Sequence, residues 1–359
     1  MPNKVEVEIE EKSKSYPIYI DSDPVEELKS RILKDFNSQK YLAVISERVY
    51  KLYGKQLGFS AEEIFILKDG EVQKNFKNYQ KILQCCEKRG LNRKSALIAI
   101  GGGVVGDITG FAAATYMRGI KFIQVPTTLL ACVDSSVGGK VAIDTEYGKN
   151  LVGAFYQPNA VYINLNFLNT LDETQFKSGL AEVVKYAFIE KSCEAHFEYG
   201  LFDFLSVHSV KILDRDLRFL EKIIKVCIEL KISVVTKDEK ETGLRKILNF
   251  GHTYGHALEK ITNYKTFTHG EAVAYGMHFI FNYAHKLKII DANYKEMAMV
   301  LLHKFGFFDK TFKYPAEKIV AIMQKDKKAE DNVIKVILPI MKGYVKEGDL
   351  DVKAAILEK

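Results

Sequence analysis

Short apolar runs alternate with longer amphipathic stretches along the first half of the chain. The apolar runs predict strands at residues 18–20, 41–45, 64–67, 96–100, 121–125 and 160–163. The stretches between them have helical periodicity, and strands that alternate with helices are typical of an α/β domain with a largely parallel sheet. A strict alternation of apolar and charged residues at positions 5–10 predicts one further, half-exposed strand before them.

The second half has a different pattern, because no proline occurs between Pro158 and Pro315. Long amphipathic stretches there predict helices, among them residues 219–235 and 271–287. We therefore expect two domains that meet near residue 165. They are an α/β domain at residues 1–165 and an all-α domain at residues 166–359.

Composition narrows the function classes. The 359 residues are 47% hydrophobic and carry a net charge of +6 with both signs interleaved, so nucleic-acid binding gains no support. The longest apolar stretch, residues 272–284, is interrupted by polar residues and is shorter than the roughly 20 residues that span a membrane. Five cysteines without a C-x-x-C pair, and an N-terminus without a signal sequence, predict reduced thiols in a soluble cytoplasmic protein.

A glycine loop follows the apolar run at residues 96–100. Gly101, Gly103 and Gly106 match the G-x-G-x-x-G spacing, and the residues after them predict a helix whose first N–H groups face a pyrophosphate. An ordinary dinucleotide-binding unit also has an acidic residue about 20 positions later for the ribose, and none occurs there. Glu71 is a candidate for that contact, with a solvated turn as the alternative.

Further polar loops follow in quick succession. Thr127 and Thr128 come directly after an apolar run, at the edge where open α/β sheets bind ligands. The next two loops place glycines beside Lys140 and Lys149. Glycine lets backbone N–H groups approach an anion and lysine supplies a point charge, so these loops predict a phosphate-bearing ligand.

The helical half contains candidate metal ligands. His252 and His256 are four residues apart, on one face of a predicted helix, and His269 opens the next helical pattern. Upstream, Glu182 and Lys185 share a helix face among apolar neighbours, which indicates either a simple ion pair or a metal-binding carboxylate. One glutamate with two imidazoles is the composition of an open catalytic zinc site. Spacing does not decide which two histidines bind.

Together these motifs resemble the 3-dehydroquinate synthase family over nearly the whole chain. The matching segments are residues 101–107, 116–119, 126–130, 134–140, 148–151, 181–185, 249–256 and 269–273. The resemblance implies a Rossmann-like NAD-binding domain, a helical domain with a divalent metal between the two, and a homodimer. It also implies the conversion of 3-deoxy-arabino-heptulosonate 7-phosphate to 3-dehydroquinate and phosphate, in the shikimate pathway of aromatic amino acid biosynthesis.

The resemblance assigns site residues position by position. The implied ligands of Zn²⁺ or Co²⁺ are Glu182, His252 and His269. The implied catalytic residues are His256, Lys185, Asp134 and Glu241. The implied substrate contacts are Arg118, from the partner subunit, with Lys140, Asn150, Lys231, Arg245, Asn249 and Lys328. The implied NAD contacts are Glu71, Lys74, Gly102, Gly103, Val104, Asp107, Thr127, Thr128, Lys140 and Lys149.

Two segments depart from the family pattern. Residues 46–48 read Ser-Glu-Arg where the family often has a Thr or Asp and an Asn, which affects adenosine contacts. After Asp326 the chain lacks a glycine that is often present, so either Lys327 or Lys328 is the phosphate contact, and we expect Lys328.

The implied reaction passes through transient NAD oxidation, phosphate elimination, reduction, ring opening and aldol closure. One alternative is a related sugar phosphate cyclase of secondary metabolism, whose substrate lacks the carboxylate that Arg245 and His256 would serve. Another is a metal-dependent polyol dehydrogenase, which has less need for cations such as Lys231. A non-catalytic nucleotide-binding module would leave the metal-ligand set unexplained.

Overall fold

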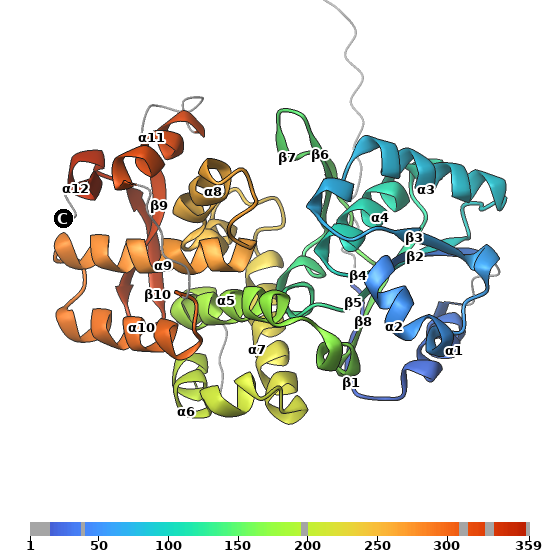
Figure 1. Ribbon diagram of the computed structural model, residues 1–359, viewed down its shortest axis with the longest axis horizontal. Coiled ribbons are helices and arrows are strands. Elements are labelled where there is room, and N and C mark those ends of the chain that lie inside the picture. Colours follow the sequence, from blue (N-terminus) through green and yellow to red (C-terminus); the bar gives the residue numbers. More distant parts are fainter. Residues whose placement is uncertain (1–14, 37–39, 195–199, 309–314, 327–333, 357–359) are drawn as a thin grey trace, which may run out of the picture.

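The computed structural model has two halves along its long axis (Figure 1). It describes residues 15–36, 40–194, 200–308, 315–326 and 334–356. Helices and a sheet form the half drawn in blue to green, and helices dominate the half drawn in yellow to red (Figure 1). The strand expected at residues 5–10 lies outside the described residues.

Six parallel strands form the sheet of the first half. In spatial order they are β1 (Ile18–Asp21), β8 (Ala160–Asn164), β5 (Lys121–Pro126), β4 (Ala96–Gly101), β2 (Tyr41–Ser46) and β3 (Ile64–Leu67). All six apolar runs are thus confirmed as strands. The winding direction reverses between β2 and β4, and at such a reversal a crevice opens beyond the carboxyl ends of the strands.

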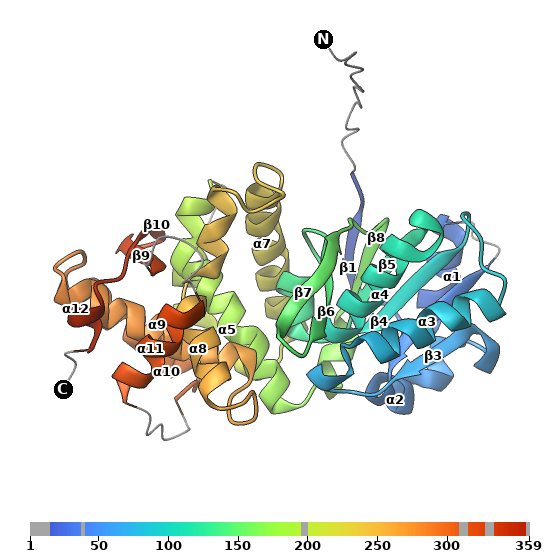
Figure 2. The same cartoon turned by 90° about the horizontal axis from the view of Figure 1, so that it is seen from above.

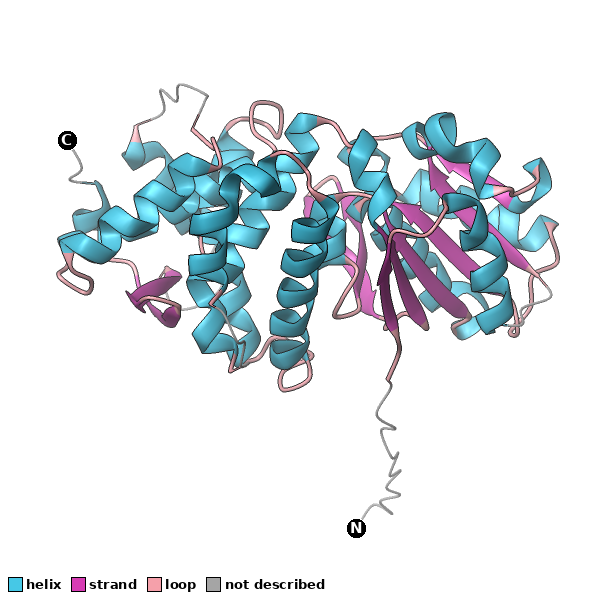
Figure 3. Ribbon diagram, turned by 90° about the horizontal axis from the view of Figure 1, so that it is seen from below, coloured by secondary structure: helices cyan, strands magenta, loops and turns pink. Residues whose placement is uncertain are grey.

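Helices cover both faces of this sheet (Figure 3). They are α1 (Val25–Phe36), α2 (Glu47–Leu57), α3 (Phe76–Lys88) and α4 (Gly103–Thr115). Within β2, Leu42 and Val44 join the apolar cluster with residues of α3 and α4, while Ala43 and Ile45 join the cluster with residues of α1 and α2. Burial on both faces explains why these strands read as continuous apolar runs.

An antiparallel hairpin that the sequence pattern did not predict lies between the two halves (Figures 1 and 2). It consists of β6 (Lys140–Thr145) and β7 (Gly148–Phe155). The hairpin packs on α4 through Val141, whose side chain reaches Gly110. It therefore carries Lys140 and Lys149, two of the expected anion contacts, toward the helical half.

The second half is helical, as predicted. Its helices are α5 (Glu173–Ile189), α6 (Leu201–Leu213), α7 (Leu217–Val235), α8 (His252–Ile261), α9 (His269–Lys286), α10 (Ala292–Lys304), α11 (Ala316–Asp326) and α12 (Val352–Ile356). The predicted helices are confirmed as α7 and α9. The antiparallel pair β9 (Lys335–Met341) and β10 (Tyr344–Asp349) is an addition. The domain boundary near residue 165 stays a prediction.

Helix α5 is the core of this half, since its residues from Ser178 to Ile189 are all buried. It crosses the middle of the molecule in Figure 1. Among the described residues, no helix is long and apolar enough to cross a membrane.

Candidate active site between the two halves

Three helices bring one carboxylate and two imidazoles together. Glu182 lies inside α5, while His252 and His269 are the first residues of α8 and α9. The Nε2 atoms of His252 and His269 lie 3.5 Å and 3.6 Å from the same oxygen, Oε1 of Glu182. One ligand atom from each residue lies within 4.8 Å of the others. This spacing suits a single metal ion with the three side chains as ligands.

The surroundings of Glu182 favour a metal over a simple ion pair. Its carboxylate is 1% exposed, and neither oxygen accepts a hydrogen bond of regular geometry from the described residues. Lys185 Nζ lies 2.5 Å from Oε2, on the side away from the imidazoles. A buried carboxylate oxygen that faces two imidazole nitrogens has lone pairs to spare, and a divalent cation would satisfy them.

The two imidazoles have opposite protonation tendencies when no metal is bound. Burial lowers the pKa of His252 to about 3. Burial also disfavours the charged form of His269, but the neighbouring carboxylates of Glu182 and Glu259 outweigh it and raise the pKa of His269 to about 10. A metal ligand must be a neutral imidazole, so His252 is ready to bind while His269 must release a proton.

Glycines allow the three helices to approach closely. Gly270 follows His269, and a Cβ there would lie 2.1 Å from the backbone oxygen of Ser178 on α5. A Cβ on Gly276 of α9 would lie 1.9 Å from the backbone oxygen of Gly251, which precedes α8. Any larger residue would push α9 away, so these contacts set the separation of His269 from the other two ligands.

A second buried group of charges lies next to the metal-type cluster. Asp134 is in the helical turn Ala131–Ser135 after β5, and its Oδ1 accepts a hydrogen bond from the Tyr186 hydroxyl at 2.8 Å. Lys231 Nζ donates to Oδ1 at 2.8 Å and to the Asp134 backbone oxygen at 2.7 Å. Burial raises the pKa of Asp134, but Lys231 and Lys185 outweigh it and hold that pKa below its usual range.

The lysines in this group respond differently to burial. Lys231 is buried, and desolvation lowers its pKa despite the partner Asp134. Desolvation acts on Lys185 as well, but Glu182 and Asp134 raise its pKa overall. Two buried ammonium groups beside two carboxylates form a polar floor that can bind hydroxyl and anionic groups of a ligand.

Further expected substrate contacts join the two halves. Glu241, in a left-handed backbone conformation with φ +60, accepts hydrogen bonds from Lys140 Nζ on the hairpin and from Asn249 Nδ2. Arg245 is 2% exposed, and its guanidinium donates to the backbone oxygen of Gly138 at 3.0 Å. The structure therefore brings the expected substrate contacts Lys140 and Asn249 together at Glu241, which was expected to be a catalytic residue.

The glycine loop lies at the carboxyl end of β4, as predicted. Gly102 is the N-cap of α4, and Gly103 and Val104 are its first two residues. A Cβ on Gly102 would lie 3.0 Å from the Thr128 side chain, and the Thr127 backbone N–H donates to the Gly101 oxygen at 3.0 Å. These loops form a surface of backbone N–H groups at a helix N-terminus, where a pyrophosphate binds favourably.

The other expected nucleotide contacts gather around Lys74. This lysine is 4% exposed, and its Nζ lies 2.5 Å from Asp107 Oδ2 and 3.9 Å from Glu71 Oε1. It also donates to the side-chain oxygen of Asn150. Asn150 therefore lies beside the residues that were expected to contact NAD. It is separated along the hairpin from Lys140, the other hairpin residue that was expected to contact the substrate.

Some predicted residues lie outside this cluster. Arg118 is exposed and follows the C-terminus of α4, about 20 Å along that helix from the glycine loop. Lys327 and Lys328 lie outside the described residues. In the segment 46–48, Ser46 caps α2 and Arg48 pairs with Asp172 at 3.1 Å, so its polar groups have structural partners.

The exposed His256 and the buried Glu259 of α8 extend the cluster beyond His269. His256 is exposed, and it forms a group with Glu259 and His269 whose ligand atoms lie within 4.8 Å of one another. Sequence reasoning missed Glu259. Its signal was the spacing, because it lies three residues after His256 and seven after His252 on one helix, and these offsets share a face.

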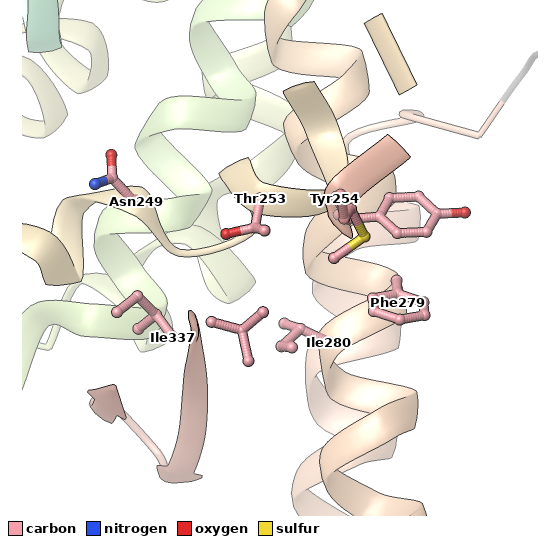
Figure 4. Close-up of a pocket in the computed structure, with 10 residues that line it drawn as sticks. Asn249, Thr253, Tyr254, Phe279, Ile280 and Ile337 are labelled. Carbon is pink, nitrogen blue, oxygen red and sulfur yellow. The ribbon is translucent and has the colours of Figure 1, made fainter. Parts of the chain in front are cut away.

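A small pocket adjoins the site behind the start of α8 (Figure 4). Asn249 lies at one end of it, and Phe279, Ile280 and Ile337 form an apolar wall (Figure 4). Thr253 donates a hydrogen bond from this region to the Lys335 backbone oxygen at 3.4 Å. The lining of this pocket is mostly apolar. This distinguishes the pocket from the charged site around Glu241, which Asn249 also contacts.

Comparison with known proteins shows sequence similarity across the whole site. The family models for the N-terminal and C-terminal parts of 3-dehydroquinate synthase match residues 64–178 and 179–329. The 3-dehydroquinate synthase of Dictyoglomus thermophilum is 44% identical over 336 residues, covering 93% of this chain and 91% of that protein. The 3-dehydroquinate synthase of Campylobacter fetus is 40% identical over 364 residues, covering 99% and 98%.

Solved structures share the fold. A 2-deoxy-scyllo-inosose synthase complexed with carbaglucose-6-phosphate, NAD+ and Co²⁺ is 27% identical, with a TM-score of 0.79 and 94% coverage of each chain. The 2-epi-5-epi-valiolone synthase of Streptomyces hygroscopicus, solved with NAD+ and Zn²⁺, is 21% identical, with a TM-score of 0.85 and 97% coverage of each chain. A probable glycerol dehydrogenase from Sinorhizobium meliloti has a TM-score of 0.66 at 15% identity.

Proposed function

The chain belongs to the 3-dehydroquinate synthase family, and from this premise we propose that it converts 3-deoxy-arabino-heptulosonate 7-phosphate to 3-dehydroquinate and phosphate. The observation that carries the proposal is the buried carboxylate of Glu182, which faces two imidazoles and pairs with the buried Lys185, next to the buried pair of Lys231 with Asp134. A metal site beside concentrated positive charge suits an anionic polyol substrate.

The described residues fit both cofactors. Glu182, His252 and His269 would hold Zn²⁺ or Co²⁺, and NAD would bind at the glycine loop, with Asp107 and Lys74 beside it. When bound, NAD accepts and returns a hydride, and the metal polarises the substrate hydroxyl that is oxidised. This chemistry makes the neighbouring C–H acidic enough for phosphate to be eliminated.

The buried charges have separate tasks in this proposal. Lys231 and Arg245 would bind the carboxylate and hydroxyl groups of the substrate, because both cations are held in fixed positions by backbone oxygens. Lys140 and Asn249 would exchange their contact with Glu241 for contacts with the substrate. In each exchange the substrate would take the place of the Glu241 carboxylate, so Lys140 and Asn249 are already arranged to bind an anion.

Proton transfers fall to groups at the edge of the metal cluster. His256 is exposed and lies beside His269, so it can exchange a proton between the substrate and water. Asp134 is held ionised by Lys231 and by its hydrogen bond from Tyr186, so it would accept hydrogen bonds from substrate hydroxyls. The substrate phosphate, through its own oxygens, remains the proposed base for the elimination.

Substrate selectivity tests this assignment against the related cyclases. The protein with zinc and NAD should release phosphate from the heptulosonate phosphate at least about 10³-fold faster, in kcat/KM, than from a seven-carbon sugar phosphate without the carboxylate. With the substrate that lacks the carboxylate, the buried charge of Arg245 would face no negative group of the substrate, and this loss would cause the difference. The Arg245→Met variant should lose most of the preference. Equal rates on both substrates would contradict the assignment.

A homodimer is part of the same proposal. Leu151 and Phe155 of β7 and Met117, beside Arg118, are exposed apolar side chains. The end of β7 and the segment after α4 that contains Met117 and Arg118 adjoin, because the hydroxyl of Tyr156 donates to the Ile120 backbone oxygen at 2.7 Å. A second copy seated on this surface would bury it and place its Arg118 in the neighbouring site.

Mixed dimers test whether Arg118 acts across the interface. Arg118→Ala and Glu182→Ala are each expected to be inactive alone, while co-refolded mixtures should recover about one quarter of wild-type turnover. Half of the dimers are then mixed. In each mixed dimer, one of the two sites has both its own Glu182 and the Arg118 of the partner subunit. As a control, Glu182→Ala mixed with Lys231→Met should stay inactive, because both changes lie in one chain's own site. Absence of recovery in the first mixture would show that Arg118 does not act on the partner.

A cytoplasmic location belongs to the proposal as well. NAD and phosphorylated sugars are both kept inside the cell, so an enzyme that needs them would work there. The five cysteines, all free thiols in the structure, are compatible with a reducing compartment.

A further inference from the structure

Glu259 of α8 connects the metal-type cluster to the hairpin of the other half. Its side chain is 5% exposed. One carboxylate oxygen, Oε2, lies 3.3 Å from Nδ1 of His269. The other, Oε1, accepts a hydrogen bond from Nζ of Lys149 on β7 at 3.3 Å. One oxygen of this buried carboxylate thus contacts the helical half, and the other contacts the hairpin of the first half.

The contact with His269 fixes how that imidazole is used. Its Nε2 faces Glu182, so the proton donated to Glu259 must be on Nδ1. His252 obtains the same orientation from a backbone group, because its Nδ1 lies 3.2 Å from the Phe250 oxygen. Only the contact of His269 therefore depends on a side chain, and a carboxylate in this position also makes the imidazole a stronger ligand.

The contact with Lys149 reaches the nucleotide side. Lys149 is on the hairpin, next to Asn150, which contacts the Lys74 group. Its ammonium also lies 4.2 Å from the ring centroid of Tyr264, and its side chain remains 31% exposed. An ammonium group has three hydrogen-bond donors, so Lys149 can keep its hydrogen bond to Glu259 and still bind a phosphate oxygen.

We propose that Glu259 is a positioning residue that couples metal binding to NAD binding. The inference rests on the proposed function, since it takes both cofactors from there. A metal on Nε2 of His269 strengthens the Nδ1–H donor and holds the Glu259 carboxylate in place. The carboxylate in turn holds Lys149. A nucleotide phosphate at Lys149 weakens the pull of this lysine on Glu259 and leaves more negative charge for His269.

The coupling has a definite sign. The metal would draw on the charge of Glu259 and leave Lys149 freer for a phosphate, and the phosphate would leave more of that charge for His269, so each ligand should tighten the binding of the other. Linkage requires the two effects to be equal in size. We expect a factor of about ten, within the range that such couplings usually have.

Two binding measurements without turnover test the coupling. The affinity of the full-length, metal-free protein for Co²⁺ is measured by competition with a chelator, with and without saturating NAD. The affinity for NAD is measured by calorimetry, with and without Co²⁺. The wild-type protein should show the same tightening, about tenfold, in both directions. Glu259→Gln keeps the size of the side chain but offers one acceptor instead of two, so it should bind Co²⁺ about 10- to 100-fold more weakly and lose the coupling.

Two further variants complete the design. Glu63→Gln removes a carboxylate that pairs with Lys29 at 2.8 Å, far from the site, and should leave both affinities and the coupling unchanged. Lys149→Met changes a partly exposed side chain, so it avoids the folding risk of a buried substitution. It should lose the coupling, and its Co²⁺ affinity without NAD should rise toward the value that the wild type has with NAD, because no lysine then competes for the Glu259 carboxylate.

The outcomes separate this inference from the function it rests on. A Glu259→Gln protein with wild-type Co²⁺ affinity would overturn the inference, and so would a Glu259→Gln or Lys149→Met protein that keeps the coupling. Wild-type protein that binds Co²⁺ and NAD independently would also overturn it and leave the proposed function standing. Wild-type protein that binds neither would contradict the proposed function itself.

Discussion

Replacing Glu182 by alanine is expected to abolish both metal retention and phosphate release. In the proposed site Glu182 would supply the anionic ligand, and its Oε1 is the oxygen that both imidazoles face. Two imidazoles alone make a weak, solvent-filled metal site. Without the metal the hydroxyl of the substrate is not polarised, and a loss of about 4 kcal/mol in transition-state stabilisation corresponds to at least about 10³-fold in kcat.

The same substitution also leaves a charge without its partner. Lys185 is 1% exposed and lies 2.5 Å from Glu182, so removal of the carboxylate leaves its ammonium with the more distant Asp134. Breaking a buried ion pair costs about 3 to 5 kcal/mol of folding free energy. Three quantities must therefore be measured for this variant: its thermal unfolding, its metal content by mass spectrometry, and its turnover.

Glu190 offers a matched control for this experiment. It is a buried glutamate directly after α5, but its carboxylate accepts a hydrogen bond from the Leu201 backbone N–H at the start of α6. Glu190→Gln should lose some stability and keep both zinc and turnover. A folded Glu182→Ala protein that retained full zinc content and rate would show that the ligand assignment is wrong.

The sheet and the glycine loop could be predicted because their signals are local. Strands buried on both faces must be apolar at successive positions, as in residues 41–45, and such runs are visible without knowledge of the fold. The glycine loop needs small residues at the end of β4. A Cβ added to Gly102 there would lie 3.0 Å from the side chain of Thr128. These requirements act within a few residues of the chain.

The metal ligands could not be chosen by spacing because their selection depends on packing. His252 and His256 share a helix face, yet His252 is buried and His256 is exposed. Gly251, the N-cap residue directly before α8, has a left-handed backbone with φ +79, and this conformation sets the direction in which His252 enters the helix. His269 joins from another helix, through contacts such as that of Gly270 with Ser178. The resemblance named the same three residues that the structure brings together.

The β6–β7 hairpin and the Glu259 contact were missed for a related reason. The strand β7 has exposed and half-exposed residues on both faces, so it lacks the apolar run that marked the other strands. Glu259 lies in a helix and has the appearance of an ordinary surface glutamate in the sequence. Only the approach of Lys149 and His269, from segments 110 and 10 residues away, makes it buried and paired.

NAD stoichiometry is expected to separate this enzyme from any dehydrogenase of the same fold. In the proposed reaction the hydride taken from the substrate is returned before the product leaves. Pairs such as Lys149 with Glu259 and Lys140 with Glu241 link the hairpin to the helical half, so we expect reduced cofactor and intermediate to stay together until the hydride is returned. A polyol dehydrogenase would instead release NADH once per turnover.

The decisive measurement follows inorganic phosphate and NADH absorbance together. The zinc-loaded protein receives the heptulosonate phosphate with NAD at about one hundredth of the substrate concentration. We expect phosphate release to continue until the substrate is consumed, about a hundred turnovers per NAD, with no net NADH. Phosphate release that stops after one equivalent of NAD, or NADH that accumulates steadily, would contradict the account.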